Sequence, residues 1–230
     1  MSRLNRWCAV LAVTAPLALA GCSSPPPALE FGTAEPSGPR LAAQPAANGS
    51  LPVAQWPNAC EVLSDTEIHA ILPQATDFER EPLKVTIMNF NPLAESAPGT
   101  TGDVAAGGCS YKFGLPSEYE SKRNSSIKLT FTAIADPALV RESYAEDMKD
   151  AREQATRLKK EFRDLGAALG AEGCFLPDLS EGPTCFRGPY KFEVDGMSTA
   201  DGVGEYPESN KNWSDKVLTH VARTVSARIP

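Results

Sequence analysis

The stretch that decides the fold is Ser126-Ile-Lys-Leu-Thr-Phe-Thr-Ala-Ile134. Its apolar and polar residues alternate, and successive side chains of a β-strand point to opposite faces of a sheet. The period of two therefore predicts a strand with one dry face and one wet face. The polar residues expected on the wet face are Lys128, Thr130 and Thr132.

Other segments have weaker strand patterns. Residues 108–113 alternate, and residues 172–176 and 184–195 carry the aromatic and β-branched side chains that favour strands. Gly182-Pro183 predicts a turn between the last two segments. Residues 84–90 alternate weakly, and we expect them to form an edge strand.

Two shorter helices are predicted from their ends. Ser64 followed three positions later by Glu67 forms a capping box, and Pro73 ends this first helix. Ser214 is expected to cap a last helix, whose apolar residues recur on one face as far as Ile229.

The longest helix opens at Asp136-Pro137, with the acid as cap and proline at the first helical position. We expect it to end within residues 159–166. One apolar stripe runs along it, which indicates either a helix covering the dry face of the sheet or the seam of a coiled-coil dimer. The stripe mixes alanine, tyrosine and methionine, so we favour the sheet-covering helix and a monomer.

These elements predict an α+β domain over residues 58–230. The expected order is α-β-β-α-β-β-α, with an antiparallel sheet of about four to five strands, helices packed on one face, and two disulfides.

The N-terminus carries a pattern of another kind. Arg3 and Arg6 precede an apolar run over residues 7–20, and Leu19-Ala20-Gly21-Cys22 follows. A basic start, an apolar run and small residues before the cleavage point are typical of a secretory signal peptide, here residues 1–21. The run is shorter than the roughly 20 residues of an ordinary membrane-spanning helix.

Leu19-Ala20-Gly21-Cys22 resembles the lipobox of bacterial lipoproteins. The resemblance implies cleavage before Cys22 and acylation (palmitate) of its sulfur and new amino group. Two or more acyl chains hold a protein stably on a bilayer. The expected location is thus the outer face of the cytoplasmic membrane, with the lipid on Cys22 as the contact with the membrane. The alternative is an ordinary secreted protein whose signal peptide ends near a cysteine.

The charge composition of the chain argues against one class of binding partner. Residues 1–21 carry two arginines and no acid, so removing them leaves 20 basic against 29 acidic residues, a net charge of −9. This balance argues against nucleic acid, whose binding requires a basic surface. Residues 22–57 are rich in proline, alanine, serine and glycine, and we expect a disordered tether there.

The cysteines fall into three groups. Cys8 leaves with the signal peptide, and lipid occupies Cys22. Four cysteines remain in an oxidising compartment, which predicts two disulfides and allows three pairings. We favour the pairing in which one bridge closes across a hairpin, namely Cys60–Cys109 and Cys174–Cys185.

Catalytic and metal-binding motifs are not evident. The sequence contains no G-x-S-x-G or H-E-x-x-H motif. It contains no C-x₂-C pair, and its two histidines, His69 and His220, fall on different predicted helices. We therefore expect no metal site and no cofactor.

Several short motifs together resemble an actinobacterial family of small lipoproteins of unknown function. Besides the lipobox and the proline-rich tether, they are Asn58-Ala-Cys-Glu-Val-Leu-Ser-Asp-Thr-Glu67, Gly107-Gly-Cys-Ser-Tyr111 and Leu165-Gly-Ala-Ala-Leu-Gly-Ala-Glu-Gly173. The family typically has Asp-Pro-Cys where this chain has Asn58-Ala59-Cys60. The resemblance implies a fold and a location, and it implies no activity.

Our leading hypothesis is a non-catalytic binding module of the cell envelope, whose ligand is an envelope protein or an apolar or peptidic molecule. The wet face of the sheet or the polar loop that we expect over residues 196–211 would present the site. A second hypothesis is an extracellular sensor-like domain, resembling the disulfide-bonded domains of actinobacterial kinases, with one concave polar pocket. A third is a wall-modifying enzyme that uses Glu118 or Glu120 together with Asp195.

Overall fold

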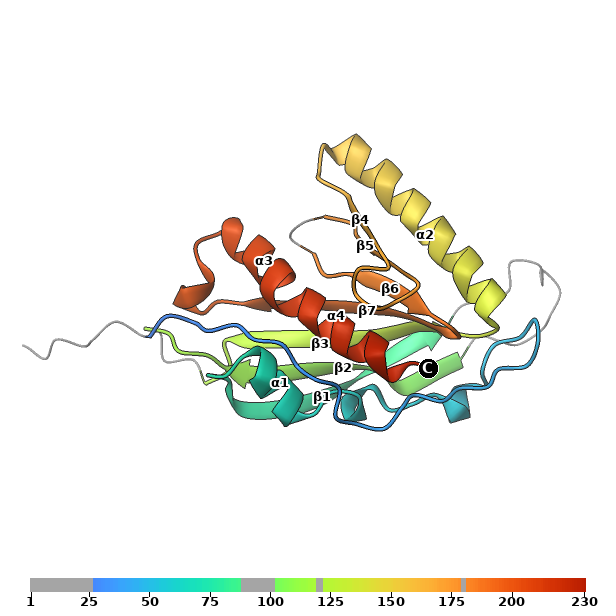
Figure 1. Cartoon of the computed structure of the whole chain (residues 1–230), viewed down its shortest axis with the longest axis horizontal. Helices are drawn as coiled ribbons and strands as arrows, with labels where there is room; N and C mark the ends of the chain where they lie inside the picture. The colour runs from blue at the N-terminus through green and yellow to red at the C-terminus, as the bar shows by residue number, and fades with distance from the viewer. Residues whose placement is uncertain (1–26, 88–101, 119–121, 179–180) are drawn as a thin grey trace, which may run out of the picture.

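One antiparallel sheet of seven strands organises the chain in our computed structural model, in the order β1-β2-β3-β7-β6-β5-β4 (Figure 1). The structure describes residues 27–87, 102–118, 122–178 and 181–230. The strands are β1 (Thr76–Ile87), β2 (Gly102–Gly114), β3 (Ser125–Ile134), β4 (Arg163–Gly166), β5 (Gly173–Leu176), β6 (Thr184–Arg187) and β7 (Tyr190–Ser198). The helices are α1 (Asp65–Ile71), α2 (Pro137–Leu158), α3 (Glu208–Trp213) and α4 (Thr219–Arg228).

The sheet is assembled from two meanders. Strands β1, β2 and β3 follow one another as antiparallel neighbours, and α2 then leads the chain to the far edge. Strands β4 to β7 return step by step, so that β7 is placed beside β3. The class expected from the sequence, α+β with an antiparallel sheet and two disulfides, is confirmed.

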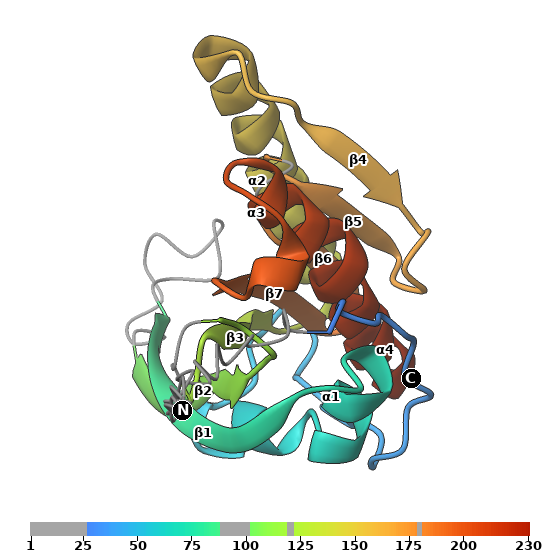
Figure 2. The ribbon, with the colours of Figure 1, turned by 90° about the vertical axis from the view of Figure 1, so that its left-hand side faces the viewer.

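The dry face predicted from the sequence is the inner face of the sheet and carries the main core. On β3, Ile127, Leu129 and Phe131 are fully buried. Leu129 stands between Cys109 of β2 and Val194 of β7 in the register of the sheet. In Figure 2 the sheet curves around α1 and α4, which lie on this inner face. The alternation in residues 126–134 therefore identified both a strand and its buried side.

The prediction that all helices pack on one face is wrong. Helix α2 lies on the opposite, outer face, where the Tyr144 ring lies 4.5 Å from the Phe186 ring of β6. It forms a second, smaller core with Phe175 of β5. The inner face of β3 is covered instead by α1 and by the helical segment that ends in α4, whose Trp213 ring lies 6.2 Å from Phe113. The apolar stripe of α2 therefore packs on the aromatic side chains of β5 and β6, and not on the inner face of β3.

The predicted strand number and order are also wrong, since the sheet has seven strands. Strand β1 begins at Thr76, in a segment whose exposed charges hide the pattern of an edge strand. Strand β4 has only four residues, in a stretch that we expected to be the end of the long helix or a bend. The single strand expected over residues 184–195 is two strands, which turn at Gly188 with a positive φ of 50°.

The helix ends agree with the sequence in two cases and differ in the third. Ser64 Oγ accepts a hydrogen bond from Glu67 N, and Ser64 N donates to the Glu67 carboxylate, so the capping box is present. Asp136 caps α2 by accepting from Ala138 N. Ser214, however, is no cap, because helical backbone runs from α3 through a π-helical turn (Ser214–Leu218) into α4. Residues 196–211 are therefore only partly a loop.

We expected a disordered tether over residues 22–57. From residue 27 onward, the structure instead shows this segment packed against the domain. Leu51 and Trp56 are buried in the main core, and Leu29, Phe31 and Leu41 pack against it. Leu51 N donates to Ile134 O, which fixes the end of this segment beside β3. Proline content alone is therefore a poor guide here, since these apolar side chains offset the cost of ordering the backbone.

Two disulfides are present in the pairing that we favoured, one between the sheet and a preceding turn and one within the sheet. Cys60, in the 3₁₀ turn Ala59–Glu61, is bonded to Cys109 of β2, with 5.0 Å between their Cα atoms. Cys174 and Cys185 are directly opposite each other on β5 and β6, with 4.1 Å between Cα atoms. Cys22 and the expected signal peptide lie outside the described residues.

Candidate functional site

Tyr111 links two of the motifs on which the family resemblance depends, residues 58–67 and 107–111. Its phenolic oxygen accepts a hydrogen bond from Leu63 N and donates one to Ala59 O, so it bridges the chain on either side of Cys60. The ring is fully buried, and the Arg80 guanidinium lies 5.6 Å from its centre. Burial raises the pKa of Tyr111 to about 12, so the phenol stays protonated. These motif residues hold the fold together and present nothing to a ligand.

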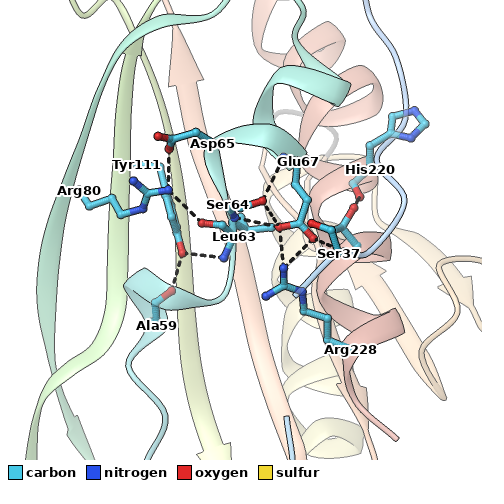
Figure 3. Close-up of polar contacts among 11 residues, drawn as sticks. Ser37, Ala59, Leu63, Ser64, Asp65, Glu67, Arg80, Tyr111, His220 and Arg228 are labelled. Atoms are coloured by element: carbon cyan, nitrogen blue, oxygen red, sulfur yellow. Dashed lines mark hydrogen bonds and ion pairs between the residues drawn. The ribbon is translucent and has the colours of Figure 1, made fainter. Parts of the chain in front are cut away.

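A buried ion pair joins the first helix to the last one (Figure 3). Arg228 Nη2 lies 2.7 Å and 2.6 Å from the two carboxylate oxygens of Glu67. The same carboxylate accepts hydrogen bonds from Ser64 N and from Ser37 N in the N-terminal segment. Burial alone would raise the pKa of Glu67, but these donors together hold it below its usual value. Donors of the protein itself thus surround the Glu67 carboxylate, while the buried Arg228 Nε has no hydrogen-bond partner among the described residues. The cluster is a structural centre.

The outer face of the sheet is a polar surface that the described helices leave partly uncovered. Helix α2 packs on β5, β6 and the beginning of β7, where Asp147 forms an ion pair with the buried Lys191. Beyond this point no helix of the described residues covers the outer face, which carries, row by row, paired residues of β2, β3 and β7. The three rows are Lys112-Ser126-Met197, Ser110-Lys128-Asp195 and Gly108-Thr130-Glu193.

Two neighbouring hollows mark this face. The first has a volume of about 280 Å³, and its polar lining includes Glu181, Thr184, Glu193 and Asp195. The second, about 290 Å³, is lined by Lys112, Arg123, Asn124, Ser125, Ser126, Met197 and Thr199. Each hollow is large enough for one or two side chains of a ligand and too shallow to enclose a drug-sized molecule.

The charges of the outer face are only partly neutralised. Lys112 pairs with Glu81, and Arg123 lies 2.7 Å from Glu79. Lys128 is exposed and makes no ion pair within the part of the chain that the structure describes. It stands opposite Asp195 in the register, between the two hollows. The free ammonium is therefore available to a carboxylate of a ligand.

The first hollow is acidic. Glu181, Glu193 and Asp195 all contribute to its lining. Loss of water around the Glu193 carboxyl raises its pKa, and the negative charges of Asp147 and Asp195 act in the same direction, against Lys191. This hollow offers carboxylates to a cationic group, and binding such a group would favour the ionised form of Glu193.

The structure separates the residues that we considered for catalysis. Glu118 lies at the tip of the β2–β3 connection, where its backbone N–H donates to Asp201, and it does not line the hollow that contains Asp195. Glu120 lies outside the described residues.

The two histidines lie on different helices, α1 and α4. His69 packs edge-on against the Phe78 ring at 4.8 Å, and His220 is half-buried on α4. Its burial, together with the nearby charge of Arg223, lowers the pKa of His220. Within residues 27–87, 102–118, 122–178 and 181–230, no group of three or more His, Cys, Asp or Glu side chains has the arrangement of a metal site.

Sequence reasoning identified part of the open face and missed the rest. Lys128 is exposed on it as predicted, and Thr130 and Thr132 are both partly buried. The Thr132 hydroxyl has no hydrogen-bond partner among the described residues. Met197, an exposed apolar side chain in the second hollow, was assigned to a loop. The alternation Val194-Asp195-Gly196-Met197 could have identified it, but the glycine obscures the pattern.

Three comparisons with known proteins gave no relative. No family model, no curated protein and no solved structure matches this chain. The resemblance to an actinobacterial lipoprotein family therefore stays a prediction. Among the described residues, no helix is long and apolar enough to cross a membrane.

Proposed function

We propose that this chain is a lipoprotein anchored through Cys22 on the outer face of the cytoplasmic membrane, where its outer sheet face binds a peptidic segment of an envelope protein without catalysis. One observation carries the proposal: among the described residues, Lys128 makes no ion pair and stands on a polar sheet face between two hollows of side-chain size. Shallow, mixed-charge surfaces of this kind suit extended polypeptide better than a small enclosed ligand.

The charged side chains of the outer face indicate which residues the bound segment would carry. The acidic hollow fits a lysine or arginine side chain, since Glu181, Glu193 and Asp195 line it. Lys128 fits a carboxylate one step along the strand, and Met197 offers apolar contact in the second hollow. The ligand is thus a segment with a basic residue followed by an acidic and an apolar one, in either chain direction.

The test is co-purification from intact membranes with matched charge variants. Lys128→Glu reverses the charge between the hollows, and Lys149→Glu makes the same change on α2, where the side chain is 73% exposed. We expect the first variant to lose about tenfold or more of the captured partner, which corresponds to roughly 1.4 kcal/mol. The control variant should capture it normally. Equal capture by both variants, or repeated capture of nothing by the wild type, would overturn the proposal.

A carboxylate-based wall-modifying activity is the second candidate, now with Glu193 and Asp195 in place of the pair considered from the sequence. The observation in its favour is that one carboxyl with a raised pKa shares a hollow with other carboxylates. Incubation with purified wall fragments tests it. Release of soluble sugars that Glu193→Gln abolishes would replace the binding module with an enzyme.

A further inference from the structure

The N-terminal segment is attached to the domain from its first described residues onward. Gln74, just before β1, accepts a hydrogen bond from Glu30 N at 2.9 Å and donates one to Ala28 O at 2.8 Å. Leu29 between them packs on Gly202, so closely that a methyl group at that glycine would lie 2.6 Å from the leucine side chain. The chain is therefore fixed at Ala28, on two elements that are far apart in sequence.

The attachment continues along the segment. Gly32 N donates to Ile71 O at 2.9 Å, and the Lys216 ammonium lies 5.0 Å from the centre of the Phe31 ring. Further on, Ser37 N donates to Glu67, and Leu41 N donates to Arg228 O at 2.8 Å. Backbone and side-chain contacts together thus hold residues 28–41 along α1 and α4, as the blue chain in Figure 1 shows.

These first contacts lie at one end of the sheet, which we call the anchor end. Gln74 precedes the first residue of β1, Thr76, and Thr76 is paired with the last residue of β2, Gly114. Gly202 follows shortly after the last residue of β7, Ser198, which is paired with Ser125 at the start of β3. The chain toward Cys22 therefore leaves the domain where β1 and β3 begin and where β2 and β7 end.

The length of chain between anchor and domain is consequently short. From Cys22 to Ala28 there are only six Cα–Cα steps, which span about 20 Å when fully extended. A free tether over residues 22–57 would instead span about 30 Å as a coil and up to about 100 Å as polyproline II.

We propose that the anchor end of the sheet is a membrane-facing surface, held within about 20 Å of the bilayer and turned toward it. This inference rests on the lipid anchor in the proposed function. It has a consequence for the binding face, because the hollow lined by Lys112, Arg123, Asn124 and Met197 lies at the same end. The ligand is then a segment presented close to the membrane surface.

The experiment compares two fluorophores on the acylated protein, bound to vesicles that carry an acceptor dye on the lipid head groups. One is attached at Thr76→Cys, at the anchor end, and the other at Ala105→Cys, near the opposite end of the sheet. Both side chains are exposed. Ala105 adjoins Val104, which pairs with Val85, so the two sites are roughly 30 Å apart along β1. We expect energy transfer at Thr76 to exceed that at Ala105 by about twofold or more at this separation.

A longer tether supplies the control. Inserting about twenty Gly and Ser residues between Pro27 and Ala28 adds a coil of roughly 25 Å and should remove most of the difference. Equal transfer from the two sites in the original chain would overturn the membrane-facing surface while leaving the anchor intact. Mass spectrometry of the same sample measures whether Cys22 is acylated. An unmodified Cys22 would overturn both the proposed lipid anchor and the membrane-facing surface. Loss of partner capture alone would affect only the binding proposal.

Discussion

Arg228 and Glu67 lie 161 residues apart in sequence, and in the structure the Arg228 Nη2 atom contacts both carboxylate oxygens of Glu67 at 2.6–2.7 Å. Both side chains are almost completely buried. The pair joins α4 to α1, and through Ser37 it also holds the N-terminal segment. Gly38 lies against the guanidinium, because a Cβ there would be 2.2 Å from Nη2. Three distant parts of the chain therefore depend on one ion pair.

Replacing one partner of this pair should be costly. Glu67→Gln leaves the buried guanidinium without a compensating charge, and breaking a buried pair in this way costs about 3–5 kcal/mol. Urea unfolding followed by circular dichroism measures the loss. Glu153→Gln on the exposed side of α2 is the matched control and should change the free energy of unfolding by less than about 0.5 kcal/mol. Similar values for the two variants would contradict a structural role for the pair.

The same pair predicts how stability depends on pH. The pKa of Glu67 is lowered in the folded protein, so its contribution is fully present above the pKa of the unfolded chain, near the ordinary glutamate value of 4.5. The contribution is lost as the pH falls through the lower folded pKa. Unfolding measured between pH 7 and pH 3 should therefore show a fall in stability at the acid end that is smaller in Glu67→Gln. An unchanged pH profile in that variant would contradict this assignment.

Tyr111 should be far more sensitive than an exposed tyrosine. Tyr111→Phe removes the hydroxyl that bridges Ala59 O and Leu63 N and leaves these buried groups unpaired, which costs about 1–3 kcal/mol. Tyr206, which is 82% exposed, supplies the control Tyr206→Phe. Thermal unfolding of both variants measures the difference in stability. Equal melting temperatures would show that the hydrogen bonds of the Tyr111 hydroxyl do not stabilise the fold.

The two disulfides should differ in their effect on stability. Cys60–Cys109 closes a separation of 49 residues and Cys174–Cys185 one of 11. The chain-entropy model gives about 4 kcal/mol for the longer loop and about 3 kcal/mol for the shorter one. Paired Cys→Ala variants compared by denaturant unfolding measure each bridge. A larger loss from the short bridge would show that local packing, and not loop closure, dominates.

The attached N-terminal segment should be visible in amide hydrogen exchange. Gly32, Ser37 and Leu41 donate their N–H groups to the domain, so these amides should exchange slowly. Glu67→Ala removes the acceptor of Ser37 and should accelerate exchange there more than at Gly32. Fast exchange at all three positions in the wild type would instead support the disordered tether expected from the sequence.

The sequence predicted the fold wherever a local pattern was strong. The alternation of residues 126–134, the capping box at Ser64 and the Asp136-Pro137 helix start all agree with the structure. Each depends on neighbouring residues alone, which is why sequence patterns report them well.

The remaining features depend on contacts that no local pattern contains. Helix α2 packs on the outer face because Phe175 and Phe186 lie there, and their side is fixed only by the register of β5 and β6. The N-terminal segment is ordered by partners such as Gln74 and Glu67 that come much later in the chain. The hollow at Met197 likewise needs the pairing of β7 with β3.

The most direct test of the binding face is photo-crosslinking from position 197 in intact native membranes. A photoreactive phenylalanine in place of the exposed Met197 lies in the hollow beside Ser126. We predict one dominant crosslinked protein, whose yield falls about tenfold (about 1.4 kcal/mol) when Lys128→Glu is added and stays unchanged with Lys149→Glu. No crosslinked protein, or the same yield in both variants, would contradict an envelope polypeptide bound on the outer face.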